Sequence, residues 1–386
     1  MPATDYQASS ATLSNLGRSI LNIRGDQVHS MEPDNNNNNG TTIDIDTFQR
    51  HVADRFHTLL AVDPDDLLTI SWISKLLDVF LSCQDEFTII MLNNRRVVNR
   101  SPTDRIVFDF FERTVKALDV CNAIRDGIEQ IRHWQKHMEI VLCALDSQRS
   151  LGEGQFRRAK KALVDLTIGM LDEKDSTAAI ANRNRSFERN QGQKDGKSFS
   201  HFRSLSWSVS RSWSAARQLI ALGNNISAPR TSEIAATNGV ALAIYIMNSV
   251  LLFVMWALVA AIPCQDRGLQ TNFNIPRQFI WAVPILSLHE KILEESKKKE
   301  RRNSCGLLRE IHRIEVSTRC MNELTDLVQF PLTEEKEREV RERVLDFAEG
   351  FEAFKNGLDP LEGKIRELFL RIVRSRTECL DSSRGN

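Results

Sequence analysis

Apolar residues recur at steps of three and four along most of this chain, which is the spacing of one face of an α-helix. The pattern predicts one helix over residues 48–60 and a second over residues 68–81. A third is expected to start at residues 101–104, where Ser101 is a suitable N-cap and Pro102 a suitable first helical residue. Its apolar face continues to Leu145, which is longer than in a typical globular helix. Such lengths predict a rod or a long bundle.

Gly127 lies inside the long third helix and is expected to be a weak point of it. Four later segments show the same spacing of apolar residues. The spacing predicts helices over residues 156–171, 307–328, 340–354 and 361–373, with faces suited to bundle or coiled-coil seams. Neither sustained strand alternation nor a repeat of about 20–50 residues is evident. The sequence therefore predicts an all-α fold, an elongated helical bundle with long amphipathic helices and one very apolar central helix.

That central helix is predicted over residues 239–262, which contain no charged side chain. At about 1.5 Å per residue it reaches about 36 Å, enough for a hydrocarbon core of about 30 Å. The apolar residues taken to face lipid or protein are Val240, Leu242, Ile244, Ile246, Leu251, Phe253, Trp256, Leu258 and Ile262.

Three arrangements suit this stretch: a single membrane span, a fully buried central helix, and a shallow hairpin formed with the shorter apolar run over residues 279–288. Asn248 near the middle, and arginines balanced before and after the stretch, weaken the prediction of a span. A span would also place the helices before and after it on opposite sides of a bilayer. The sequence leaves the choice open.

Changes of composition divide the chain into five parts. These are a disordered segment over 1–42, a helical bundle over 43–174, a Ser/Arg/aromatic linker over 175–232, the apolar helix over 233–265, and a C-terminal helical region over 266–386 that packs on the N-terminal helices. In the linker, aromatic residues alternate with arginines, which suits a membrane interface, a partner surface or a solvated linker. Ser204, Ser206 and Ser212 stand near arginines and are candidate phosphorylation sites.

Charge and cysteine content restrict the class of protein. Lys plus Arg and Asp plus Glu both number 51, so no overall field favours nucleic acid. The basic cluster over residues 297–302 is interpreted as a solvated face, with contact to anionic lipid or to nucleic acid as the alternatives. The seven cysteines lack paired spacing, as expected of free thiols in a reducing compartment. The first residues lack an apolar signal region, so we expect a protein of the cytosol and of membranes that is not secreted.

Motifs for chemistry are missing from the sequence. It contains no Walker A loop, GxGxxG turn or GxSxG elbow. His133 and His137 lie four residues apart, but the segment HWQKH lacks the glutamate base of a metalloprotease and no third ligand is marked. We therefore expect no catalytic residues, no metal, no cofactor and no small-molecule substrate, and a protein that is not an enzyme.

Several blocks resemble one known family. The opening MPATDYQ, the segment VLLFVMWALVAAIPCQDRG and the segment RQFIWAVPILSLHEKILEESKKK are similar to the Roh-like branch of the plant-specific Bypass/Roh-like family. The resemblance implies a non-enzymatic protein that binds the exocyst's membrane-targeting subunit and influences secretion. The Bypass-like branch implies instead a role in controlling a mobile root-derived developmental signal. The family supplies no catalytic residues, the partner-binding residues are not assigned, and the asparagine run over residues 35–39 departs from it.

Overall fold

The computed structural model describes residues 39–146, 151–171, 214–264, 269–271, 273–301 and 304–384. The chain divides into two units, Met1–Gly40 and Thr41–Asn386, and the fold below is that of the second. Every regular element in the described residues is helical, as predicted: α2 (Asn39–Leu60), α3 (Ile70–Asn93), α4 (Arg95–Val98), α5 (Thr103–Ala144), α6 (Glu153–Met170), α8 (Ala215–Gly223), α9 (Thr231–Ala236), α10 (Val240–Ala261), α11 (Ala282–Lys297), the 3-10 turn η1 (Lys299–Arg301), α12 (Arg309–Leu327) and α13 (Glu334–Arg384).

The predicted apolar faces of the N-terminal helices are the faces that pack. Phe48, Val52 and Phe56 of α2 are buried. The α3 helix begins after Thr69, whose hydroxyl accepts a 3.1 Å hydrogen bond from the Trp72 backbone N–H. This capping interaction satisfies one of the backbone donors that a helix start leaves without an intrahelical partner.

The start of α5 differs from the prediction by one or two residues. Pro102 occupies the cap position, the helix begins at Thr103, and the cap residue makes no side-chain hydrogen bond. Proline is tolerated here because its missing N–H belongs to the first turn, where backbone donors have no helical acceptor. Thr103 is buried, so packing of the first turn stabilises the start of the helix in place of the predicted Ser101 cap.

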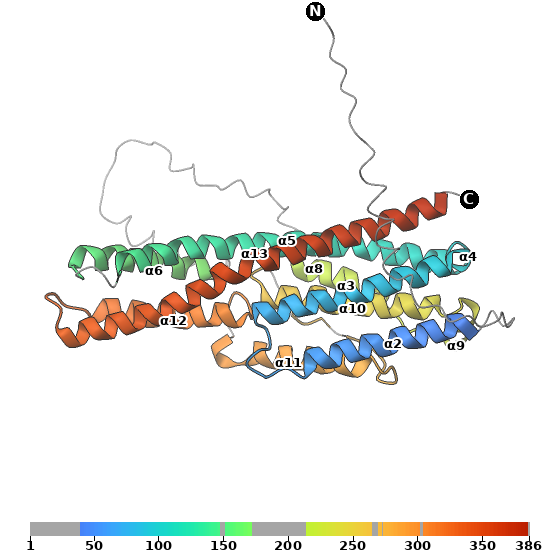
Figure 1. Ribbon diagram of the computed structural model, residues 1–386, viewed down its shortest axis with the longest axis horizontal. Coiled ribbons are helices and arrows are strands. Elements are labelled where there is room, and N and C mark those ends of the chain that lie inside the picture. The colour runs from blue at the N-terminus through green and yellow to red at the C-terminus, as the bar shows by residue number, and fades with distance from the viewer. Residues whose placement is uncertain are drawn as a thin grey trace, which may run out of the picture. The chain divides into compact units, whose positions relative to one another are not determined.

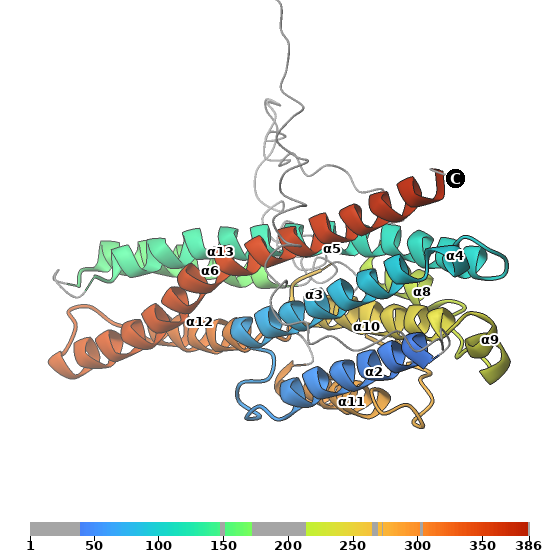
Figure 2. The ribbon, with the colours of Figure 1, turned by 45° about the vertical axis from the view of Figure 1, so that its right-hand side comes forward.

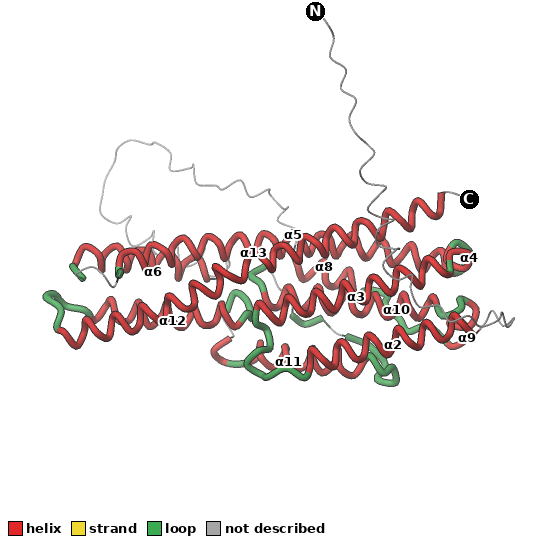
Figure 3. Tube along the Cα trace, viewed as in Figure 1, coloured by secondary structure: helices red, strands yellow, loops and turns green. Residues whose placement is uncertain are grey.

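The long helices lie side by side. The α5 helix packs against α6, α8, α10 and α13 (Figure 1). The α13 helix in turn packs against α12, α3 and α5. The turned view keeps α13 beside α3 and α5, and these two helices also pack on α10 (Figure 2). Figure 3 shows mostly short loops joining the described helices. The elongated bundle of the prediction is therefore the observed architecture.

The C-terminal helices predicted as two segments form one. α13 is 51 residues long and contains Pro360, which removes one backbone donor without ending the helix. Buried Leu358, Leu361 and Ile365 continue the packed face across the proline, so tertiary packing holds the helix where local propensity would end it.

Ion pairs fix the direction of α13. Lys364 pairs with Asp78, and Arg371, seven residues later, pairs with Asp85, seven residues later on α3, so the two helices run parallel. Against α5 the order reverses: Arg132 contacts Asp359 at 2.7 Å, and Arg376 donates to the Phe111 carbonyl at 3.1 Å. Segments from before and after α10 are thus joined directly.

Two boundaries differ from those expected. The α2 helix begins at Asn39, inside the segment expected to be disordered. Residues 215–223 of the expected linker form α8, which starts after Ser214, whose hydroxyl accepts from the Arg217 backbone N–H, and packs against α5 and α10. The apolar Leu219 and Leu222 are buried in that contact, which explains why a helix forms there.

Candidate functional site

The helix α10 lies at the centre of the bundle and is buried along its whole length. All 22 of its residues are buried, and it packs against α3, α5, α8, α9 and α11. The buried set includes every residue predicted from the apolar pattern: Val240, Leu242, Ile244, Ile246, Leu251, Phe253, Trp256, Leu258 and Ile262. Among the described helices it alone is long and apolar enough to cross a membrane by length and composition.

This burial favours one of the three arrangements. A helix that spans a bilayer presents apolar side chains to lipid, whereas every side of α10 meets protein in this fold. Asn248 is only 6% exposed, and Ser249 donates to the Tyr245 carbonyl at 2.9 Å. The fold is therefore that of the fully buried central helix.

The second apolar run covers α10 instead of entering a bilayer beside it. The Tyr245 ring lies 5.7 Å from that of Trp281 and 5.8 Å from that of Phe279. Further along α10, the Trp256 ring lies 4.4 Å from the His289 ring. Trp281 is fully buried, so residues 279–288 form a lid over one side of the central helix.

The carboxyl end of α10 is closed by a loop over residues 304–308, called here the closing loop. The Leu307 N–H donates to the Ala260 carbonyl at 2.9 Å, and the Leu308 N–H donates to the Ala261 carbonyl at 3.1 Å. These are two of the carbonyls that a helix end leaves without intrahelical donors. Gly306 permits the approach, because a Cβ there would lie 2.5 Å from the Ala261 carbonyl oxygen.

Gly127 of α5 also permits a close approach of backbone near the end of α10. A Cβ at this position would overlap the Pro263 carbonyl oxygen and lie 2.8 Å from Cγ2 of Ile262. The α5 helix is continuous through this glycine, so the expected weak point does not interrupt the helix. Gly127 is instead where the chain leaving α10 crosses α5 at close range.

A buried polar cluster supports the closing loop, and the sequence did not reveal it. Arg301 is 4% exposed and donates to the Leu308 carbonyl at 3.3 Å, although its segment was predicted as a solvated face. The Ser304 hydroxyl lies 2.9 Å from Oε1 of Glu315 and 2.6 Å from the Gly306 carbonyl oxygen. Burial raises the pKa of the Glu315 carboxyl, and the Ser304 hydrogen bond opposes that shift.

The start of α12 holds the loop between α2 and α3. Arg309 donates to the Pro64 carbonyl at 2.6 Å and to the Leu67 carbonyl at 3.3 Å. The neighbouring Glu310 carboxylate accepts from the Ile70 N–H at 3.0 Å, at the start of α3. Burial raises the pKa of Glu310, and this backbone hydrogen bond lowers it in part. Two charged side chains at the start of α12 thus order the loop between α2 and α3, about 240 residues earlier in the sequence.

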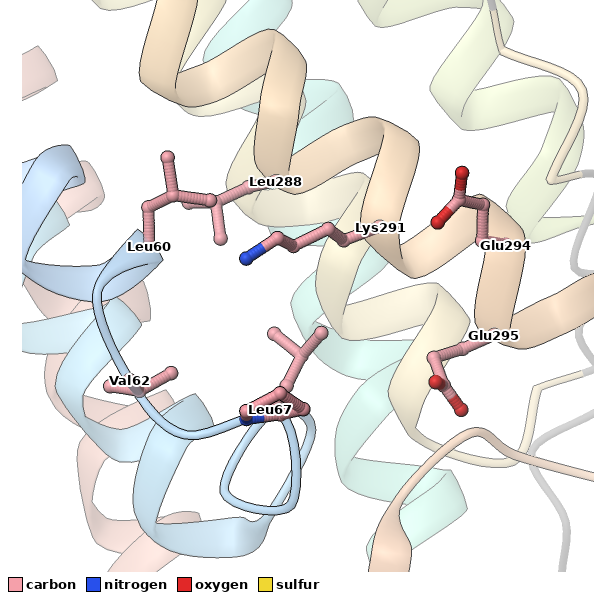
Figure 4. Close-up of a pocket in the computed structure, with 8 residues that line it drawn as sticks. Leu60, Val62, Leu67, Leu288, Lys291, Glu294 and Glu295 are labelled. Atoms are coloured by element: carbon pink, nitrogen blue, oxygen red, sulfur yellow. The ribbon is translucent and has the colours of Figure 1, made fainter.

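A small hollow lies between that loop and α11. Its volume is about 210 Å³, and its lining comprises Leu60, Val62, Pro64, Leu67, Leu288, Lys291, Glu294 and Glu295. Figure 4 shows Lys291 reaching from α11 toward the space between Leu60 and Leu67. This lining holds no nucleophile paired with a base, and its volume is below the range of about 300–1,000 Å³ typical of ligand sites.

The remaining candidates for chemistry are dispersed. The described residues contain no group of three or more side chains suited to holding a metal ion, and His133 is exposed on α5. Six cysteines form no disulfide, as the spacing predicted: Cys83, Cys121, Cys143, Cys264, Cys305 and Cys320. Burial raises the pKa of Cys83 and of Cys121 to about 12, which makes both poor nucleophiles at neutral pH.

Comparison with known proteins settles the family. The family model described as Protein ROH1-like matches residues 1–383. The chain belongs to the ROH1-like family. It is 58% identical to Protein ROH1D of Arabidopsis thaliana over 99% of this chain and 98% of that protein, and 36% identical to Protein ROH1A of the same plant over 98% and 96%. No solved structure matches the chain.

Within this ROH1-like chain, two sets of sequence-based candidates fall outside what the structure describes. Ser204, Ser206 and Ser212, proposed as phosphorylation sites, lie outside the described residues, as do the aromatic residues of the expected linker. They remain predictions. The groups that organise the described site, Arg301, Arg309 and Glu315, come from segments that the periodicity marks only as ordinary amphipathic helix or charged surface.

Proposed function

We propose that this ROH1-like protein is a non-enzymatic helical adaptor that binds the exocyst's membrane-targeting subunit and regulates secretion in plant cells. Family membership over nearly the whole chain is the observation that carries the proposal. The bundle is consistent with it, because the interior is filled by α10 and the polar clusters inside serve loop closure. The protein acts from the cytosol and at membranes, through its outer helix faces.

The surface best suited to a protein partner lies along α3 and α13. Ile89 of α3 is 53% exposed, and Leu370 of α13 is 55% exposed. Because Asp85 and Arg371 pair between these parallel helices, both apolar side chains lie within about one helical turn of that contact. We call Ile89 and Leu370 the α3–α13 ridge. Exposed apolar residues at helical spacing are suited to contact with a helix of a protein partner.

A binding measurement with the full-length chain tests this function. The purified protein is expected to bind the purified targeting subunit, and the double variant Ile89→Gln, Leu370→Gln is expected to lose about tenfold or more in affinity. The matched control is Leu327→Gln, Leu345→Gln, which removes two apolar side chains that are 71% and 65% exposed elsewhere. This control should bind as the unmodified protein does.

Absence of binding by the unmodified full-length chain would overturn the proposed function. An equal loss of affinity in the ridge and control variants would leave the proposed function standing, but it would show that the α3–α13 ridge is not the binding surface. Normal secretion in plants lacking the protein, together with altered shoot–root signalling, would support the developmental-signalling alternative instead.

A further inference from the structure

The hairpin between α3 and α5 ends in a concentration of unpaired arginines. The short helix α4 forms this end, beyond the last residues of α3 (Figures 1 and 2). We define the arginine tip as its four exposed arginines with the two exposed apolar residues beside them: Arg95, Arg96, Arg100, Arg105, Leu92 and Phe108.

Charge at the tip is unbalanced, although the whole chain has equal numbers of acidic and basic residues. Within the described residues, none of the four arginines forms an ion pair. Arginines elsewhere in the bundle do, such as Arg132 of α5 with Glu362 and Arg371 of α13 with Asp85. Two acidic residues lie in this stretch, Asp104 and Asp109. Asp109 faces Arg113. Burial lowers the pKa of the Arg113 guanidinium, and the nearby Asp109 carboxylate opposes this effect in part. The tip therefore keeps a net positive charge.

Apolar side chains are exposed among these arginines. Phe108 is 62% exposed, and it follows Arg105 by three residues on α5, so the two share a helix face. Leu92, 39% exposed, lies at the end of α3 just before Arg95. A cation beside an exposed aromatic ring is the combination found where proteins meet the headgroup region of a bilayer.

We propose that the arginine tip docks on the surface of an anionic phospholipid bilayer. Positive charge selects an anionic surface, and Phe108 and Leu92 gain from the partly apolar headgroup region. The tip is the turn at the end of a helical hairpin, and the hollow described above lies elsewhere, against α11. This exposed turn presents positive charge and apolar side chains together, the combination that an anionic bilayer surface binds. This contact leaves α10 enclosed, and it goes beyond the proposed binding of the exocyst subunit.

Co-sedimentation with vesicles tests the proposal on the full-length chain. The protein is expected to bind vesicles of phosphatidylcholine mixed with phosphatidylserine, to bind phosphatidylcholine alone much more weakly, and to dissociate with added salt. Each arginine near an anionic surface is expected to strengthen membrane binding by about fivefold. Replacing all four tip arginines by glutamine should therefore lower partition onto the vesicles by at least about a hundredfold. Phe108→Ser is expected to lower it by about tenfold without a change of charge.

A variant with the same change of charge supplies the control. Arg158, Lys161, Arg319 and Arg338 are exposed cations without an ion pair among the described residues, and none of them lies in the tip. Replacing these four by glutamine should leave vesicle binding nearly unchanged. Binding to exocyst subunit by the tip variant should also persist, which separates this proposal from the proposed function.

Equal vesicle binding by the tip variant and the unmodified protein would overturn the proposal, as would equal binding to neutral and anionic vesicles. Failure of the unmodified protein to bind anionic vesicles, combined with tip-dependent binding to an acidic peptide or to nucleic acid, would assign the arginines to that other partner.

Discussion

Replacing Gly127 with alanine is expected to destabilise the fold by about 3 kcal/mol, an unusually large effect for a single added methyl group. The added Cβ overlaps the Pro263 carbonyl oxygen and presses on Ile262, and backbone cannot move aside as a flexible side chain can. Relieving the overlap requires α5 to separate from the end of α10. Urea unfolding of the full-length chain, followed by circular dichroism, measures the change in free energy of unfolding.

The chain provides a matched control in Gly363, which lies within α13. A Cβ at this glycine meets no other heavy atom within 4 Å. Gly363→Ala is therefore expected to stabilise the protein by about 0.4–1 kcal/mol, since alanine has less freedom to lose on folding and a better helix propensity. Equal effects of the two substitutions would contradict the close crossing of α5 and the segment after α10.

Replacing Arg309 with methionine is expected to cost about 2 kcal/mol. The substitution keeps the length of the side chain but removes its charged hydrogen bonds to the Pro64 and Leu67 carbonyls. Leu68 in that loop has a φ of 65°, a left-handed conformation that is unfavourable for a leucine and that the surrounding contacts must stabilise. We therefore expect the loop between α2 and α3 to open more readily. Urea unfolding measures the loss of stability, and hydrogen exchange at residues 61–69 measures the local opening.

Arg313 on the same helix is the control for that experiment. It pairs with Glu349 on the surface, and such exposed pairs contribute at most about 1 kcal/mol. Arg313→Met should therefore have a small effect and leave exchange at residues 61–69 unchanged. If both methionine variants behave alike, Arg309 does not order the loop.

Local periodicity predicted most of the helices because the same residues that mark a face in sequence are the ones that pack. Phe48, Val52 and Phe56 are an example, since each is buried as its spacing requires. Continuity of α13 was not predictable in this way. Pro360 has a local preference for ending a helix, and only packing of Leu358 and Leu361 against other segments outweighs it.

The position of α10 illustrates the limit of hydropathy. A helix apolar on all sides is expected both in a bilayer and at the centre of a large bundle, so its composition alone cannot distinguish the two. The deciding contacts come from segments distant in sequence. Gly127 lies more than a hundred residues before the end of α10, and Leu307 lies well after it. Periodicity within α10 contains no information about either neighbour.

The enclosure of α10 is tested most directly by cross-linking Asp78→Cys to Lys364→Cys in the full-length protein within cell extracts that retain membranes. These positions pair in the fold, yet they lie on opposite sides of α10 in the sequence. Cys143, which is exposed, is replaced by serine to reduce background. The control pair Arg55→Cys and Glu86→Cys lies wholly before α10 and joins two contacting residues in either topology.

An enclosed α10 predicts that a short thiol-specific cross-linker joins both pairs. Cross-linking of the control pair without cross-linking of positions 78 and 364 would contradict the enclosed helix, because a bilayer-spanning α10 would hold those two positions on opposite sides of the membrane.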